Sequence, residues 1–348
     1  MFEWRQRPHS RLNPLTGEWV LVSPQRTARP WQGEIERVEH PPPVPYDPTC
    51  YLCPGNERAG AHRNPAYDQT FVFTNDFPAL VPDTPRERFD ESGLRVAEAE
   101  PGTTRVLCFS PIHDMTLSRM STAAIGNVVA EWCAQNSELG SMPLVNYVQI
   151  FENRGQMMGA SNPHPHCQIW ASHRIPNEIA KEQASQRGWM KSKSSCLLCD
   201  YLGLESNSER VVTANAGFVA LVPFWAVWPF EILIVGRRHT GDISSLNAGE
   251  RAELADILRR VTTRYDNLFE SPCPYSMGFH QSPSDSPDGE QHDEWHLHAH
   301  FLPPVLRSAS IRKFMVGYEL LAMPQRDITP EEAAARLREL PDVHYLDR

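Results

Sequence analysis

The chain has 348 residues, of which 41% are hydrophobic and 22% are charged. This composition is typical of folded globular proteins and excludes disorder as the main state. The 43 acidic residues outnumber the 33 basic ones, and the net charge of −10 argues against a protein that binds nucleic acid along its phosphates. We therefore expect any phosphate-binding site to be local, within one or two packed domains.

Neither export nor membrane insertion is indicated. The first ten residues, MFEWRQRPHS, lack the apolar segment and cleavage site of a secretion signal, so we expect a cytoplasmic protein. The stretch 217–236 is mostly apolar and about as long as a membrane span, but Pro223, Pro229 and Glu231 interrupt it. Its β-branched and aromatic residues favour two buried strands around a proline-rich turn, so we predict no membrane contact.

The first series of predicted elements starts at a Cys-x-x-Cys segment, CYLC, which begins at Cys50. Two strand-like segments follow, and the second leads to His113. The spacing of apolar residues then predicts a helix with Ser121 as its N-cap and Gly140 beyond its end. A strand over 145–151, a glycine-rich turn and the segment NPHPHCQIW complete the series.

The same order of elements occurs a second time. A second Cys-x-x-Cys segment, CLLC from Cys196, precedes two strand-like segments and His239. Asn247 and Glu250 then predict a capping box at the start of a long helix. The segments YSMGFH and WHLHAHFLPP close this copy, and Thr329, followed by a proline and two glutamates, predicts a further short helix.

An internal repeat of this kind indicates two similar halves, which we place at residues 1–180 and 181–348. Helices separated by antiparallel strand pairs, without strict β-α-β alternation, predict an α+β fold. The sequence contains neither GxxxxGKS/T nor GxGxxG, so a bound nucleotide would use neither a P-loop nor a Rossmann site.

Cysteine and histidine spacing predicts a metal site in the first half. In a cytoplasmic chain, Cys-x-x-Cys pairs indicate metal ligands more than disulfides. Tetrahedral zinc takes four sulfur and imidazole ligands, and Cys50, Cys53 and His113 supply three of them. The best candidate for the fourth is His164.

Alternating histidines predict a chemically active strand in each half. Side chains two apart on a strand share a face, so His164, His166 and Gln168 point together. The second half repeats this pattern with His296, His298 and His300. If His164 binds metal, His166 remains free for chemistry. A neutral imidazole is abundant at pH 7 and suits nucleophilic attack on phosphorus, which gives a phosphohistidine-type adduct.

Motifs along the chain resemble those of the galactose-1-phosphate uridylyltransferases of the histidine-triad superfamily. They are FENRGQMMGASNPHPHCQIW, PLTGEWVLVSP, RTARPWQG, FTNDFPAL, TRYDNLF, SMGFH, LHAHF and RSASIRKFMVGYELL. The resemblance covers nearly the whole chain, because motifs of both halves and of the C-terminus agree in order and spacing. It implies two histidine-triad-like repeats, each an antiparallel half-barrel sheet with a long helix.

The resemblance also implies a ping-pong exchange. His166 would attack the α-phosphorus of UDP-glucose, release glucose 1-phosphate and carry a uridylyl group, which galactose 1-phosphate would accept to give UDP-galactose. Gln168 and Ser161 would stabilise the charge that develops on the phosphoryl oxygens. Family members usually pair as dimers with substrate sites shared between subunits, so we expect a homodimer.

Matching motifs imply a set of residues that hold the nucleotide and the sugar phosphate. They are Arg26, Arg29, Asn75, Asp76, Asn153, Gln168, Lys313, Phe314, Tyr318, Glu319 and Gln325. One residue departs from the family members compared first, which have glycine where this chain has Cys167. We expect that thiol to lie on the strand face opposite His166, and its role stays open.

The second half offers two metal-ligand sets. The set that resembles the two-zinc arrangement of the related ADP-glucose phosphorylases consists of Cys196, Cys199, His239 and His296. The set that resembles the iron site of better-known uridylyltransferases consists of Glu182, His280, His298 and His300. Because thiolates favour zinc, we predict a second zinc at the cysteine set in preference to iron at the other. Since His296 and His298 are neighbours on one strand face, we expect that the two sets are not both filled.

Two other functions stay open. A related nucleotidyl transferase or phosphorylase acting on ADP-glucose would use the same histidine chemistry with a different base. A non-catalytic zinc protein that binds nucleic acid is disfavoured by the net charge of −10 and by the lack of a basic run.

Overall fold

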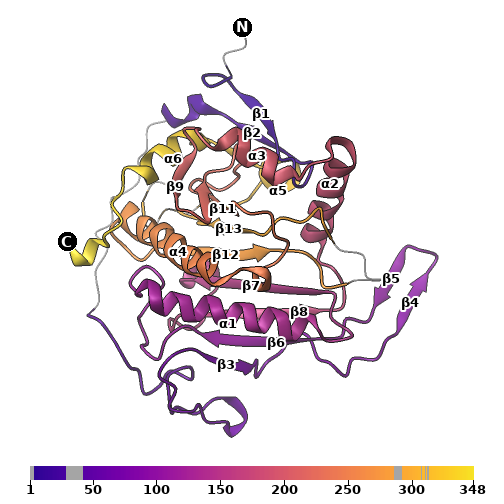
Figure 1. Ribbon diagram of the computed structural model, residues 1–348, viewed down its shortest axis with the longest axis vertical. Coiled ribbons are helices and arrows are strands. Elements are labelled where there is room, and N and C mark those ends of the chain that lie inside the picture. The colour runs from indigo at the N-terminus through magenta and orange to yellow at the C-terminus, as the bar shows by residue number, and fades with distance from the viewer. Residues whose placement is uncertain (1–3, 29–41, 286–291, 307, 310, 312) are drawn as a thin grey trace.

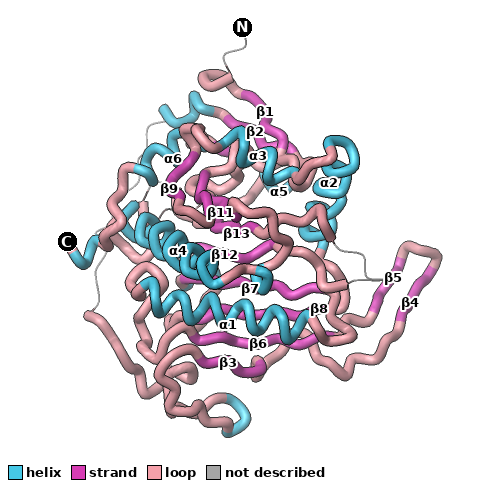
Figure 2. Tube along the Cα trace, viewed as in Figure 1, coloured by secondary structure: helices cyan, strands magenta, loops and turns pink. Residues whose placement is uncertain are grey.

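The computed structural model describes residues 4–28, 42–285, 292–306, 308–309, 311 and 313–348. Its α-helices are α1 (Thr122–Gly140), α2 (Asn177–Lys193), α3 (Leu197–Glu205), α4 (Ala248–Leu268), α5 (Tyr318–Leu321) and α6 (Pro330–Arg338). Its strands are β1 (His9–Leu12), β2 (Trp19–Val22), β3 (Phe71–Thr74), β4 (Arg88–Glu91), β5 (Arg95–Glu98), β6 (Gly102–Cys108), β7 (Tyr147–Arg154), β8 (His166–Ser172), β9 (Val211–Ala214), β10 (Phe218–Leu221), β11 (Ile232–Gly236), β12 (Tyr275–His280), β13 (His298–Leu302) and β14 (Gln325–Arg326). Figure 1 labels most of these elements, and Figure 2 separates helices from strands by colour.

The central element is a sheet in which nine of the described strands follow the order β3-β6-β8-β7-β12-β13-β11-β10-β9. All neighbouring pairs in it are antiparallel. Strands β7 and β12 pair at the junction of the two halves, where Asn153 lies opposite Ser276. Outward from this junction, β7-β8-β6-β3 mirrors β12-β13-β11-β10. The α+β fold with two similar repeats is thus confirmed, and the two half-sheets are joined into one.

Helices α1 and α4 lie side by side on one face of this sheet (Figures 1 and 2). Helix α1 buries Ile125, Val128, Val129 and Trp132, which recur at the spacing of one helix face. Helix α4 buries Leu254, Ile257, Leu258, Val261 and Tyr265 in the same way. Both stripes belong to one apolar core that extends over the two halves. The opposite face of the sheet is therefore free to carry polar side chains.

The ends of the helices follow the predicted capping signals. Ser121 accepts a hydrogen bond from the Ala124 amide at the start of α1. Asn247 with Glu250, and Thr329 with Glu332, form capping boxes at the starts of α4 and α6. Gly140 is the last residue of α1 and not the first beyond it, a difference of one residue.

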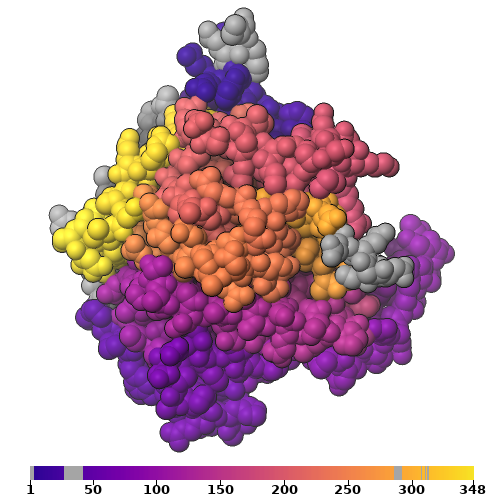
Figure 3. Space-filling view, viewed as in Figure 1, coloured from indigo at the N-terminus to yellow at the C-terminus, as the bar shows by residue number. Residues whose placement is uncertain are grey.

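Segments outside the repeat pack on the C-terminal half. Strand β2 pairs with β1 and, in parallel, with β14 near the C-terminus, so the beginning of the chain lies beside residues of the second half. Figure 3 shows this indigo segment above the second half and apart from the rest of the first. The sequence did not predict α2 and α3, because α2 buries a largely polar face, of Ile179, Glu182, Gln183 and Gln186.

The apolar stretch 217–236 forms the buried strands β10 and β11 with a turn between them, as predicted. Within the part of the chain that the structure describes, no helix combines the length and the apolar character needed to cross a bilayer.

Candidate functional site

Strand β8 carries two of the predicted catalytic residues on the face of the sheet that α1 and α4 leave free. His166 and Gln168 are partly exposed there, and Cys167 between them is buried on the helical side. The Cys167 Sγ accepts a hydrogen bond from Trp132 Nε1 at 3.2 Å, and burial raises the pKa of this thiol. Cys167 therefore packs in the core, on the side predicted for it.

The hydrogen bonding of His166 defines which ring nitrogen is free. Its Nδ1 lies 2.7 Å from the backbone oxygen of His164, and because a carbonyl can only accept, Nδ1 carries the hydrogen. Burial lowers the pKa of His166, while this hydrogen bond acts in the opposite direction. The ring is thus neutral at pH 7 and keeps the lone pair of Nε2, as a nucleophile or base requires.

His166 lines a cavity of about 230 Å³ at the ends of β7 and β8, together with Asn153 and Ser161. Asn153 is held across the junction of the halves, where its Oδ1 accepts a hydrogen bond from Ser276 Oγ at 2.6 Å. Gln168 follows His166 by two residues on β8 and does not line the cavity. Its Oε1 accepts a hydrogen bond from Trp170 Nε1 at 2.9 Å, which leaves its amide NH₂ free to donate. The cavity thus combines a neutral imidazole with hydrogen-bonding side chains.

The four predicted ligands of the first half, Cys50, Cys53, His113 and His164, form one group whose ligand atoms all lie within 4.8 Å of one another. The Nδ1 atoms of His113 and His164 are 3.4 and 3.5 Å from Cys53 Sγ. Tetrahedral zinc, with bonds of about 2.0 Å to nitrogen and 2.3 Å to sulfur, requires about 3.5 Å between such atoms. His164 Nε2 donates to the Ser110 carbonyl at 2.8 Å, which fixes the ring with Nδ1 toward the cysteines.

The cysteine group of the second half has the same design but brings together only three of the four predicted ligands. His296 Nδ1 lies 3.4 Å from both Cys196 Sγ and Cys199 Sγ, and its Nε2 donates to Gly236 O at 2.7 Å. His239 stays outside this group. Its ring stacks on that of His296 at an interplanar angle of 8°, and its Nε2 is 2.9 Å from Trp295 O. The corresponding rings in the first half, His113 and His164, meet edge-on at 84°.

A third group gathers Glu182 of α2 with His280, His298 and His300. Glu182 Oε1 is 3.0 Å from His280 Nδ1, and its Oε2 is 3.2 Å from His298 Nε2. Burial alone would raise the pKa of Glu182, but His280 and His298 hold that pKa well below its ordinary value. A deeply buried carboxylate with three imidazoles around it is a donor set that suits iron or zinc.

The two ligand groups of the second half share no residue, so their geometry does not support our expectation that they exclude each other. His296 precedes strand β13, which begins at His298, and turns its Nδ1 toward the cysteines. His298 instead uses Nε2 toward Glu182, and its Nδ1 donates to the His296 carbonyl at 2.7 Å. The two histidines therefore serve different groups.

The other predicted substrate residues lie in two groups, and none of the described ones lines the His166 cavity. Asn75 and Asp76 follow β3. In the second group Lys313 contacts Glu319 and the Gln325 carbonyl, and Gln325 bonds to Asp327, which pairs with Arg26 at 3.2 Å. Phe314 and Tyr318 of that region are more than half exposed, at 54% and 56%. Arg29 lies outside the described residues.

A buried ion pair that the sequence did not predict joins the halves at the cavity. Arg154, which lines the cavity, forms two hydrogen bonds of 2.8 and 2.9 Å with Asp266 of α4. Asp266 also accepts hydrogen bonds from Ser118 Oγ at 2.5 Å and from the Cys273 amide at 2.8 Å. The feature of the sequence that could have indicated this pair is a charged residue, Asp266, directly after Tyr265 of the buried stripe of α4.

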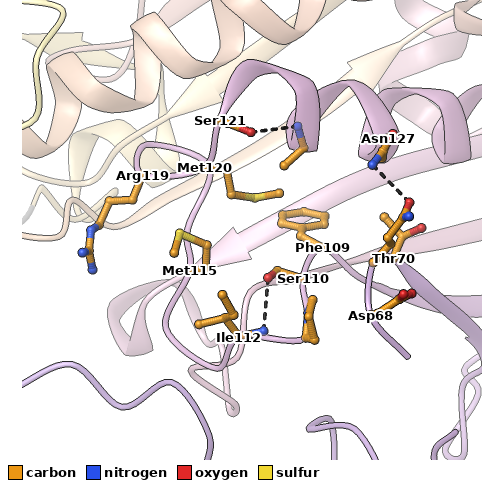
Figure 4. A pocket seen from close by; sticks show the side chains of 13 residues that line it. Asp68, Thr70, Phe109, Ser110, Ile112, Met115, Arg119, Met120, Ser121 and Asn127 are labelled. Atoms are coloured by element: carbon orange, nitrogen blue, oxygen red, sulfur yellow. Dashed lines mark hydrogen bonds between the residues drawn. The ribbon is translucent and has the colours of Figure 1, made fainter. Parts of the chain in front are cut away.

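A second cavity, of about 310 Å³, opens beside the N-terminus of α1 (Figure 4). Phe109, Met115 and Met120 give it an apolar lining, with Asp68 and Asn127 at its polar side. It contains no predicted site residue, although Ser110, which lines it, holds His164 through its carbonyl.

Comparison with known proteins agrees with this architecture. The N-terminal domain of galactose-1-phosphate uridyl transferase matches residues 1–176, and the C-terminal domain of that family matches residues 182–348. The galactose-1-phosphate uridylyltransferase of Haemophilus influenzae is 48% identical over 100% of this chain and 99% of its own. That of Rattus norvegicus is 48% identical over 99% of this chain and 90% of its own.

Among solved structures, a uridylyltransferase superposes with a TM-score of 0.74 at 29% identity, covering 94% of this chain and 97% of its own. An ADP-glucose phosphorylase from Arabidopsis thaliana has a TM-score of 0.76 at 23% identity, covering 97% of this chain and 99% of its own, and shares the fold. The protein is by class a nucleotidyltransferase. It belongs to the galactose-1-phosphate uridylyltransferase family.

Proposed function

We propose that this protein transfers UMP from UDP-glucose to galactose 1-phosphate through a uridylyl-histidine intermediate on His166. The observation that carries the proposal is the tautomer of His166, whose Nδ1 is bound by the His164 carbonyl at 2.7 Å while Nε2 keeps its lone pair at the cavity. The names of relatives that match over the whole chain support the choice of substrates.

Two displacements at the same phosphorus make up the reaction. In the first, His166 Nε2 forms a bond to the α-phosphorus of UDP-glucose, and the bond to the bridging oxygen breaks, so glucose 1-phosphate leaves with the electron pair. In the second, a phosphate oxygen of galactose 1-phosphate forms the new bond and His166 is released. The adduct places positive charge on the ring, and the Nδ1–H···O bond to His164 stabilises that charge. Ser161 and the amide of Gln168 donate to the phosphoryl oxygens.

We propose zinc for the two cysteine groups, because their sulfur and nitrogen atoms have the separations of ligands on one tetrahedral ion. Zinc in the first half would hold His164, whose carbonyl orients His166. Since the Glu182 group is separate, we propose that it takes a further ion, iron or zinc, at the same time. Elemental analysis should find about three metal ions per chain, and Cys196→Ser should remove one zinc while leaving the ion at Glu182. Fewer than two zinc ions per chain, unchanged by Cys196→Ser, would contradict this assignment.

We also propose a cytoplasmic homodimer, with repeat domains at 1–180 and 181–348. A surface stretch around α5 supports the dimer, because it exposes large apolar side chains that water disfavours and a second subunit could cover. They are Phe314, Val316, Tyr318, Leu320 and Leu321. The substrate residues of this stretch lie apart from the His166 cavity of the same chain, as expected if they serve the cavity of the partner.

Substrate choice is tested by initial rates of sugar-phosphate exchange with UDP-glucose and ADP-glucose, each with galactose 1-phosphate as acceptor. We expect turnover with UDP-glucose and none measurable with ADP-glucose. Preference for ADP-glucose would assign the protein to the adenylyl chemistry instead. Absence of any exchange, with tight binding of a single-stranded oligonucleotide at low salt, would point to the nucleic-acid-binding alternative.

A further inference from the structure

Arg58 lies in the loop that follows the first cysteine pair, and it neither belongs to a metal-ligand group nor lines the His166 cavity. Three hydrogen bonds make this loop rigid. Asn56 Nδ2 donates to Cys50 O at 2.7 Å, Asn64 Nδ2 donates to Cys53 O at 2.9 Å, and the Arg58 amide donates to His62 O at 2.7 Å. The backbone of Cys50 and Cys53 therefore fixes the position of the Arg58 backbone, from which its side chain extends.

The Arg58 guanidinium is buried against an aromatic ring. Its carbon lies 3.7 Å from the centroid of Phe73, and only 10% of the side chain is exposed. Phe73 and Phe71 in turn stack at 5.3 Å between centroids. Such contact of a cation with a ring face is favourable, but it leaves the N–H donors of the guanidinium without acceptors.

Two of these donors are unsatisfied within the described part of the chain. Arg58 Nε and Nη1 are buried and have no hydrogen-bond partner there. Among the described residues the nearest opposite charge is Asp76, whose Oδ1 is 3.5 Å from Nη1, beyond a normal hydrogen bond. A buried guanidinium with open donors is costly, so a small shift of Asp76 toward Arg58 is favoured.

We propose that Arg58 is a positioning residue that orients the Asp76 carboxylate for the ribose hydroxyls of the nucleotide. A carboxylate accepts hydrogen bonds and so takes the hydroxyl donors of a sugar, while the guanidinium behind it holds it in place. The inference rests on the proposed function, because it takes Asp76 as part of the nucleotide site. It also connects the first metal loop, through Arg58, to the binding of the nucleoside.

The test compares binding of UMP and of its 2′-deoxy and 3′-deoxy analogues to wild-type protein and to Arg58→Lys, by calorimetry. Lysine keeps the positive charge but lacks the planar guanidinium group and its fixed set of N–H donors. We expect UMP affinity to fall about tenfold in the variant, with a smaller fall for the analogue that lacks the hydroxyl bound by Asp76. Equal losses for all three ligands, or none, would overturn the proposal.

Two further variants separate this role from a structural one. Arg63→Lys changes another arginine of the same loop, whose Nε bonds to Gly55 O at 2.7 Å, and it should bind all three ligands as wild type does. In the double variant Arg58→Lys with Asp76→Asn, UMP should bind about as weakly as to Asp76→Asn alone, since Arg58 acts through Asp76. Additive losses would contradict the proposal. If wild-type protein binds no UMP, the proposed function itself fails, whatever the variants do.

Discussion

The two halves of the sheet carry the same histidine arrangement and use it differently. In both, the backbone oxygen of one histidine lies 2.7 Å from the Nδ1 of the histidine two residues later, His164 with His166 and His296 with His298. In the first half His166 lines a cavity and is partly exposed. In the second half the ring of His298 is 1% exposed and its Nε2 is 3.2 Å from Glu182.

The difference comes from what the rest of the chain places opposite the ring. Helix α2 brings Glu182 against His298, whereas the turn between β7 and β8 leaves space at His166. Equivalent strands and the same tautomer therefore give a candidate nucleophile in one half and a candidate metal ligand in the other. The contrast shows that the repeat determines the orientation of the imidazole ring. The chemistry of the ring is determined by its access to a cavity and by neighbouring charges.

The largest expected effect separates the two histidines directly. His166→Ala should lower the exchange rate at least about 10³-fold with little loss of stability, because the nucleophile is removed from a site that contributes little packing. His298→Ala should keep a measurable uridylyl adduct and lose the metal ion of the Glu182 group. Initial rates and metal content of both variants check this. Comparable loss of adduct in the two variants would break the distinction between the halves.

A smaller effect concerns the ion pair that joins the halves. Asp266→Asn leaves Arg154 buried without its counter-charge and should lower the free energy of unfolding by about 3–5 kcal/mol, measured by urea denaturation. Asp342→Asn is the matched control, because Asp342 pairs with Arg260 and Arg264 but is 37% exposed, and it should cost about 1 kcal/mol or less. Similar losses in both variants would show that the halves do not depend on the pair.

The smallest effect is a pH dependence at the same junction, where Tyr275 of β12 donates to Glu152 of β7 at 2.9 Å. Burial raises the pKa of Glu152 to about 7, although Arg154 and Tyr275 act to lower it. The folded state then holds a proton that the unfolded state has released above pH 4.5, so this carboxyl should destabilise the fold as pH rises from about 4.5 to about 7. The loss is at most about 3 kcal/mol.

Glu152→Gln removes this titration and keeps an acceptor for Tyr275. Its free energy of unfolding should decline less than that of wild type over that pH range, because the other titrating groups are common to both proteins. Parallel stability curves would show that Glu152 does not titrate in this range.

Sequence spacing sufficed for features that depend on neighbouring residues. Alternation along β8 predicted that His166 and Cys167 lie on opposite faces, and the apolar spacing of α1 and α4 predicted their buried stripes. The first ligand group followed from cysteine spacing and the repeat. Each of these patterns reflects a period of two or of 3.6 residues, which local sequence records.

Features that depend on distant contacts were not predictable in this way. Arg154 and Asp266 are 112 positions apart, and they meet only in the folded chain, where β7 pairs with β12 and α4 packs beside α1. Strand period alone suggested that the sets containing His296 and His298 are not both filled, because it does not show that β13 begins after His296. The stacked ring of His239 is likewise a side-chain rotation that spacing does not encode.

The most direct test of the account is the intact mass of the protein after incubation with UDP-glucose, followed by galactose 1-phosphate. We predict one uridylyl group per chain, mapped to His166 by peptide analysis and lost when galactose 1-phosphate is added. An adduct on His298, an adduct that persists in His166→Ala, or turnover of UDP-glucose without any covalent intermediate would contradict it.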